Sequence, residues 1–170
     1  MTEPTGRSEP FQTQRGRLQQ SQRRLHELRP AVEAGEPWPL AARFGTEPEA
    51  RWGPPEVLAH VAEMLPFWLG EIERILASPA EPGPFGRVST DAIRIDVIER
   101  DRTLPARELF DRIDATLGRL ERRLSQLTEA QAGRRGIHAT RGEMTITELL
   151  ERFVVGHLED HAAQLEDALA

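Results

Sequence analysis

One stretch near the end of the chain decides the fold: Thr145-Ile-Thr-Glu-Leu-Leu-Glu-Arg-Phe-Val-Val-Gly-His157-Leu-Glu-Asp-His161-Ala-Ala-Gln-Leu165. Its apolar residues recur at the spacing of one face of an α-helix. Thr145 and Glu148 are spaced as a capping box at the start of that helix. His157 and His161 lie four residues apart, so they stand one turn apart on the same, apolar face. Two histidines that point into a core indicate either a metal site or a pair of core histidines hydrogen-bonded to their neighbours.

Three further segments show the same helical periodicity, over residues 11–33, 54–76 and 103–132. Four long helices with apolar stripes predict an all-α fold, a four-helix bundle with a long connection between helices 2 and 3. That connection covers residues 78–104, is rich in Pro and Gly, and is expected to hold one short helix over 91–99. Residues 133–144 are expected to form a loop that carries His138, and no strand is predicted.

The composition favours one compact domain over residues 11–170, preceded by a flexible tail over residues 1–10. The formal charge of −6 argues against nucleic acid as a partner, because binding to phosphates requires a basic surface. There is no run of apolar residues long enough to span a membrane and no apolar signal region, so we expect a cytoplasmic protein. The chain has no Cys, so a bound metal would need His, Asp or Glu as ligands.

His60 adds a third inward-facing histidine, because it follows Val57 by three residues and precedes Met64 by four. Three unpaired imidazoles in a core would each cost on the order of 1–3 kcal/mol if left unsatisfied. A shared divalent ion would satisfy all three and still leave positions open for water or substrate, as in catalytic metal sites. The sequence therefore predicts His60, His157 and His161 as metal ligands, and a structural histidine cluster with ordered water stays the alternative.

These motifs resemble the DinB-like superfamily of bacterial four-helix proteins over about residues 12–169. The resemblance rests on three stretches, which are, in chain order, Trp52-Gly-Pro-Pro-Glu-Val-Leu-Ala-His60, the run from His138 to Leu150, and Gly156-His157-Leu-Glu-Asp-His161. It implies a bundle with one divalent metal, zinc or nickel, held by the three histidines. Some relatives are S-transferases or isomerases that use small cytoplasmic thiols, and many have no assigned activity.

Three functions fit this sequence, which identifies neither a thiol nor a second substrate. The first is a metal-dependent enzyme that transfers a small thiol to an electrophile, and a metal-dependent hydrolase with the same ligands is its nearest alternative. The second is a metal-containing protein without turnover, such as a stress-related binding module. The third is an interaction protein whose histidines are structural. The resemblance favours the transferase, with a small-molecule substrate, such as a low-molecular-weight thiol, as its partner.

The surroundings of the site carry weaker signals. Glu63 follows His60 by three residues, so it could face the pocket as a base or as a partner of a ligand. The favoured expectation is a solvated carboxylate on the helix surface. His138 is expected to lie in a loop away from the site. The connection over 78–104 and the segment with Trp38 and Trp52 are expected to form the pocket walls. The aromatic residues of that segment and the heptad-like third helix also suggest a homodimer.

Overall fold

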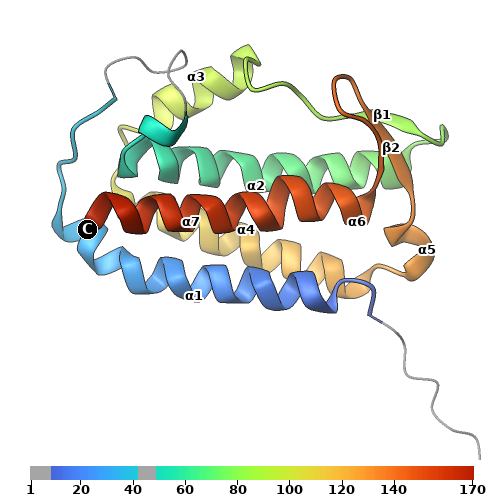
Figure 1. Ribbon diagram of the computed structural model, residues 1–170, viewed down its shortest axis with the longest axis horizontal. Helices are drawn as coiled ribbons and strands as arrows, with labels where there is room; N and C mark the ends of the chain where they lie inside the picture. Colours follow the sequence, from blue (N-terminus) through green and yellow to red (C-terminus); the bar gives the residue numbers. More distant parts are fainter. Residues whose placement is uncertain (1–8, 42–48) are drawn as a thin grey trace, which may run out of the picture.

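The computed structural model describes residues 9–41 and 49–170. Four long helical segments run alongside one another and form the bundle (Figure 1). The first three are α1 (Gln12–Ala34), α2 (Pro54–Ala77) and α4 (Ala106–Gln126), and the last is continuous from α6 (Ile146–Leu149) through a π-helical segment η2 (Leu150–Val155) to α7 (Gly156–Leu169). The predicted all-α class and four-helix bundle are confirmed. Residues 1–8 of the predicted tail lie outside the described residues.

The core lies between the four helices and is built from their apolar stripes. The seam of α4 is buried along its whole length and consists of Phe110, Ile113, Leu117, Leu120 and Leu124. It packs on α1 and α2. That seam is covered within one chain and Trp52 is buried, so neither of them supplies exposed apolar surface, while Trp38 is partly buried. The dimer stays a prediction without that support.

The long connection after α2 holds two elements, β1 (Gly83–Phe85) and α3 (Ala92–Asp101), and α3 packs on α2. The short helix agrees with the prediction, and the Asp91 side chain caps it by accepting a hydrogen bond from the Arg94 backbone N–H at 3.0 Å. The short 3-10 turn η1 (Glu49–Arg51) precedes α2, and α5 (Glu129–Ala132) follows α4.

A small sheet, which the sequence does not predict, closes one end of the bundle. Its strands are β1, β2 (Arg135–His138) and β3 (Gly142–Thr145), in the order β1-β2-β3. β1 pairs in parallel with β2, with Phe85 opposite His138, and β2 pairs antiparallel with β3. The prediction that residues 133–144 form a loop is therefore wrong. These strands are only three or four residues long, which is too short for an alternating pattern to stand out.

The last helix departs from the expected regular α-helix at η2. The Gly156 N–H bonds to the carbonyl of Glu151, five residues earlier, which is the π-helical pattern. The capping box of Thr145 and Glu148 forms as predicted, at the start of α6. Within the described ranges, the structure contains no helix that combines the length and the apolar content needed to cross a bilayer.

Candidate metal centre

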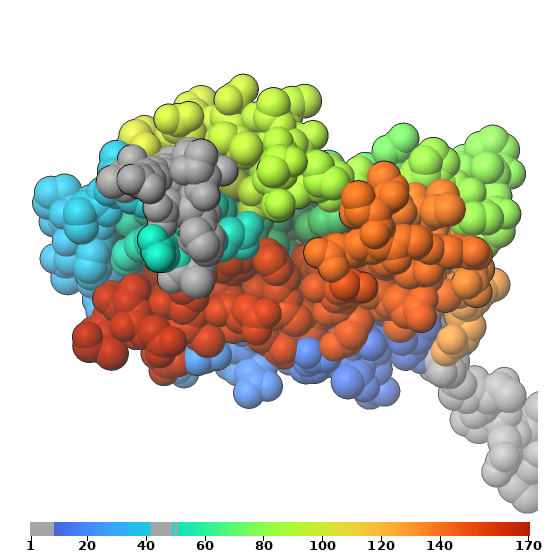
Figure 2. All heavy atoms as spheres, turned by 45° about the horizontal axis from the view of Figure 1, so that its top comes forward, coloured from blue at the N-terminus to red at the C-terminus, as the bar shows by residue number. Residues whose placement is uncertain are grey.

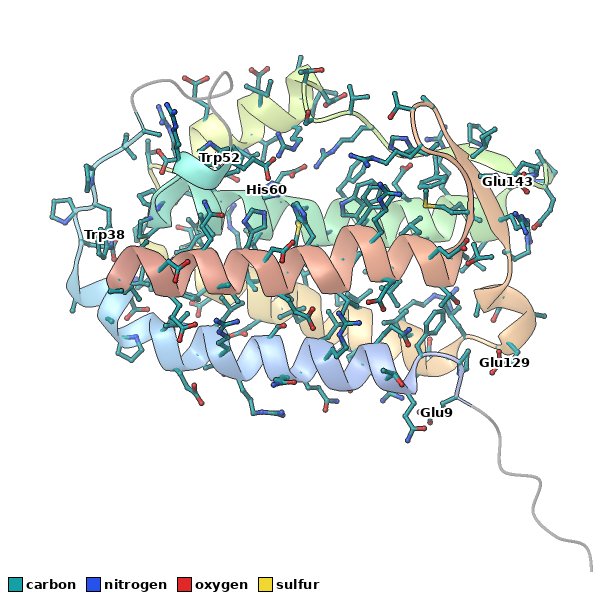
Figure 3. The ribbon with its side chains drawn as sticks, in the orientation of Figure 1. Glu9, Trp38, Trp52, His60, Glu129 and Glu143 are labelled. Atoms are coloured by element: carbon teal, nitrogen blue, oxygen red, sulfur yellow. The ribbon has the colours of Figure 1, made fainter. Side chains whose placement is uncertain are left out.

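The structure brings the three predicted histidines together between α2 and α7. Figure 3 shows His60 lying between the ribbons of these two helices. Nε2 of His157 lies 3.0 Å from Nε2 of His60 and 3.0 Å from Nε2 of His161. The rings of His60 and His161 meet edge to face, with centroids 4.8 Å apart. Three imidazole nitrogens gathered this closely are a donor set that a divalent ion can bind, so these residues fit a metal ion.

Gln164 fixes the orientation of His161. Nδ1 of His161 lies 3.0 Å from Oε1 of Gln164, and an amide oxygen only accepts, so Nδ1 carries the hydrogen and donates it. This leaves the lone pair of Nε2 facing the other two histidines. The Gln164 amide group donates in turn to the backbone carbonyl of Glu49. A ligand whose second nitrogen is held by an outer hydrogen bond is typical of metal sites in proteins.

Glu63 stands in a similar position behind His60. Its Oε2 is 3.9 Å from Nδ1 of His60, too far for a hydrogen bond but close enough to favour a hydrogen on Nδ1. The carboxylate is nearly buried and accepts a hydrogen bond of 2.7 Å from Arg87. The expectation of a solvated Glu63 is therefore wrong. Glu63 lies one helical turn after His60 on α2. Arg87, in the connection after β1, pairs with its carboxylate and shields it from solvent.

The environment keeps the imidazoles neutral. Burial is the main cause that lowers the pKa of His60 well below its ordinary value, and the nearby charge of His161 adds to it. Burial also lowers the pKa of His157 to about 4 and lowers the pKa of His161. Neutral imidazole is the form that binds metal. The cluster is therefore in its ligand form at neutral pH.

Glu49, which the sequence reasoning missed, adds a carboxylate to this cluster. Its Oε2 is 3.7 Å from Nε2 of His161 and 3.9 Å from Nε2 of His157. Each of these four residues offers one ligand atom, and the four atoms lie within 4.8 Å of one another. The other carboxylate oxygen of Glu49 accepts a hydrogen bond from Arg94, which is only 7% exposed. No periodic signal marks Glu49, because it lies in a three-residue turn before α2.

A pocket of about 240 Å³ opens onto the cluster. Figure 2 shows a hollow at this place, between the yellow-green segment after β1, the orange hairpin and the red last helix. His60, His157 and Glu49 are among its lining residues, and its walls also combine aromatic rings with arginines. The lining residues from the rest of the wall are Trp68, Arg87, Val88, Ser89, Arg94, His138, Thr140, Arg141 and Phe153.

The expected pocket walls are partly right. Arg87 and Arg94 line the pocket, so the connection over 78–104 does form part of it. Trp52 instead packs against the ring of His60 from behind, with centroids 5.5 Å apart. Trp38 lines a different hollow, next to Leu58 on α2. Trp68 provides the indole of the wall.

His138 is buried in the pocket wall, against the expectation of a loop residue away from the site. Its Nδ1 accepts from the Thr140 backbone N–H at 3.2 Å, so Nε2 carries the hydrogen and donates to the Arg87 carbonyl at 3.0 Å. Both nitrogens are thereby engaged, and His138 is a wall residue and not a ligand. Gly86 makes room for it: φ is +85°, and a Cβ there would lie 2.2 Å from the His138 ring.

A four-helix bundle with three inward histidines and a neighbouring carboxylate defines a class of helical proteins with a candidate metal centre between the helices. The chain belongs to the DinB superfamily, whose sequence profile matches residues 17–165. No curated protein and no solved structure matches the chain.

Proposed function

We propose that this protein is a metal-dependent enzyme that transfers a small thiol to an electrophile. The observation that carries the proposal is the cluster of three Nε2 atoms, two of whose histidines, His60 and His157, line an open pocket. A divalent ion held there would act as a Lewis acid and lower the pKa of a bound thiol. Zinc and nickel are the ions that we propose.

The residues around the cluster suit this reaction. The chain has no Cys, so the thiol must come from outside as a substrate. In the transfer, the thiol sulfur forms a bond to carbon, the leaving group departs with its electron pair, and the thiol proton passes to a base. Among the described carboxylates, Glu49 lies nearest to the Nε2 atoms of His157 and His161, and we propose it as that base. Trp68 and Phe153 give one part of the pocket wall an aromatic lining.

The same carboxylate supports a second candidate, a hydrolase. Glu49 would then take a proton from an attacking water molecule in place of a thiol. The ligands and the pocket are the same in both reactions, so the geometry favours neither by itself. The resemblance to thiol-using relatives is the reason to place the transferase first. A protein that holds a metal without turnover is the third reading.

The test uses metal-loaded protein and two substrates. Protein treated with a chelator and reloaded with Zn²⁺ or Ni²⁺ is mixed with cytoplasmic thiols and 1-chloro-2,4-dinitrobenzene, and separately with a 4-nitrophenyl ester. The transferase predicts a rate above background in the first assay that is lost in His157→Ala and kept in His26→Ala, whose histidine is on the surface, paired with Asp114. Background rates with every thiol, while metal is bound, would overturn it. Ester hydrolysis alone would support the second candidate.

A further inference from the structure

The charges around the pocket are not balanced among the described residues. Three arginines line it, against one carboxylate, Glu49. Arg94 is paired with Glu49 and donates to the Ser89 carbonyl at 2.9 Å. Arg87 is paired with Glu63. In the described part of the chain, Arg141 makes no ion pair, and it is exposed at the pocket.

The aromatic wall beside Arg141 forms one stack. The Phe153 ring lies nearly parallel to Trp68, with centroids 4.4 Å apart, and nearly parallel to His138, with centroids 5.6 Å apart. The guanidinium carbon of Arg141 is 6.0 Å from the Phe153 centroid. A guanidinium that makes no ion pair, next to an apolar wall, is suited to a molecule with a carboxylate at one end and an apolar body.

We infer that the pocket binds an anionic substrate, whose carboxylate pairs with Arg141 while its apolar part lies along Phe153 and Trp68. Its reactive end would then face His60 and His157, which line the same pocket. The inference rests on the proposed function in taking this pocket as the substrate site. The carboxylate belongs either to the thiol or to the electrophile, since both would enter the same pocket.

The first experiment compares matched probes by isothermal titration calorimetry on metal-loaded protein. Phenylacetate and phenylacetamide differ only in charge and stand for the electrophile; 3-mercaptopropionate and 3-mercaptopropionamide do the same for the thiol. At least one carboxylate should bind more tightly than its amide, and added salt should weaken that binding. Equal affinity within both pairs would overturn the inference.

The second experiment asks whether Arg141 causes the difference. Arg141→Gln should weaken the preferred carboxylate by about 10-fold and leave its amide unchanged. Arg152→Gln is the matched control: Arg152 is also exposed and lies 5.8 Å from the Phe153 centroid, but it does not line this pocket. Equal losses in both variants would mean a general field effect and would overturn the inference, as would no loss in Arg141→Gln.

The two arms also identify the source of the carboxylate. Dependence on Arg141 in the phenylacetate arm assigns it to the electrophile, and dependence in the mercaptopropionate arm assigns it to the thiol. These are binding measurements, so they separate this inference from the proposed reaction. Arg141-dependent binding without any thiol transfer would support the anion subsite and count against the transferase, and the reverse result would do the opposite.

Discussion

Helix α4 and the last helical segment have similar lengths but different construction. α4 runs without interruption for 21 residues, and its apolar seam repeats at steps of three and four. The last segment is continuous but contains the π-helical stretch η2, where the buried residues come in adjacent pairs, Leu149 with Leu150 and Val154 with Val155. Those pairs are five residues apart, which matches the π-helical hydrogen bond. Both helices contribute buried residues to the core, and the irregular one also carries Phe153 and two of the three histidines.

In the last helix, the stretch that departs from the α-helical period lies next to the candidate site. A π-helical turn holds one more residue than an α-helical turn, so it rotates everything that follows it. Here that change comes just before His157. Phe153, within the π segment, and His157, after it, both line the pocket. A core helix has no need of such a turn, and α4 has none.

The largest expected effect comes from His157→Ala. We expect a loss of metal affinity beyond the roughly 10–100-fold that is typical of losing a residue that only orients a ligand. Helix content should stay, because the four apolar stripes hold the bundle. Metal content by mass spectrometry and helicity by circular dichroism measure both. Unfolding of the metal-free variant at room temperature would contradict this, and His26→Ala is the control.

For Leu120→Ala in the α4 seam, we expect a loss of stability without a loss of metal affinity. Leu120 is fully buried, so its truncation should lower the free energy of unfolding by about 2–5 kcal/mol. Metal affinity of the folded protein should not change, because α4 contributes no residue to the cluster. Urea unfolding followed by metal titration under native conditions would check this. A parallel loss of metal affinity would show that the two helices are less independent than their construction implies.

Gln164→Leu tests the support behind His161. It removes the acceptor for Nδ1 while keeping a side chain of similar volume, and we expect metal affinity to fall by roughly 10-fold. Competition with a chromophoric chelator would measure the change. Gln22→Leu is a fitting control, since Gln22 bonds to Asp114 far from the cluster. Unchanged affinity in Gln164→Leu would mean that His161 is held by packing alone.

Two glycine substitutions compare the helices directly. A Cβ on Gly118 in α4 would meet only the end of the Arg122 side chain, at 3.5 Å. Gly118→Ala should therefore raise the free energy of unfolding by about 0.5–1 kcal/mol. A Cβ on Gly156 would lie 3.1 Å from the Glu151 carbonyl oxygen in the π segment. Gly156→Ala should show no such gain. Equal increases in thermal stability for the two variants would mean that the π segment accommodates the added methyl group at little cost.

A further effect concerns pH and metal-free protein. The folded pKa of His60 is lowered, and that of His157 is about 4, against an ordinary value of 6.5. The unfolded chain therefore binds more protons below pH 6.5, and stability should fall as pH drops from 6.5 toward 4. Urea midpoints across this range would measure it. The fall should be smaller in His60→Ala, and an equal fall would assign it to other groups.

Much of the fold is predictable because long helices bury a periodic face. Ile113, Leu117 and Leu120 on α4 are buried as the period requires, and the same reasoning places His60 inward. The sheet is not predictable, because β1 and β2 come from distant parts of the chain and are short. Glu49 and Arg141 lie outside long helices, where no period exists to assign a face. The adjacent apolar pairs, Leu149 with Leu150 and Val154 with Val155, are a sequence signal for the π turn. A search for α-helical periodicity alone overlooks that signal.

The separation of the histidines along the chain has a consequence for how the centre is assembled. His60 and His157 are 97 residues apart, and β1 pairs with β2 across a shorter but still long separation, with Gly83 opposite Gly136. Contacts between distant residues form late in folding, because the intervening chain must first be closed into a loop. During synthesis, Glu49 and His60 emerge well before His157 and His161, so half of the candidate ligands are missing at that stage. The centre therefore forms only when both halves of the domain have come together, and a bound metal ion would lock that final step.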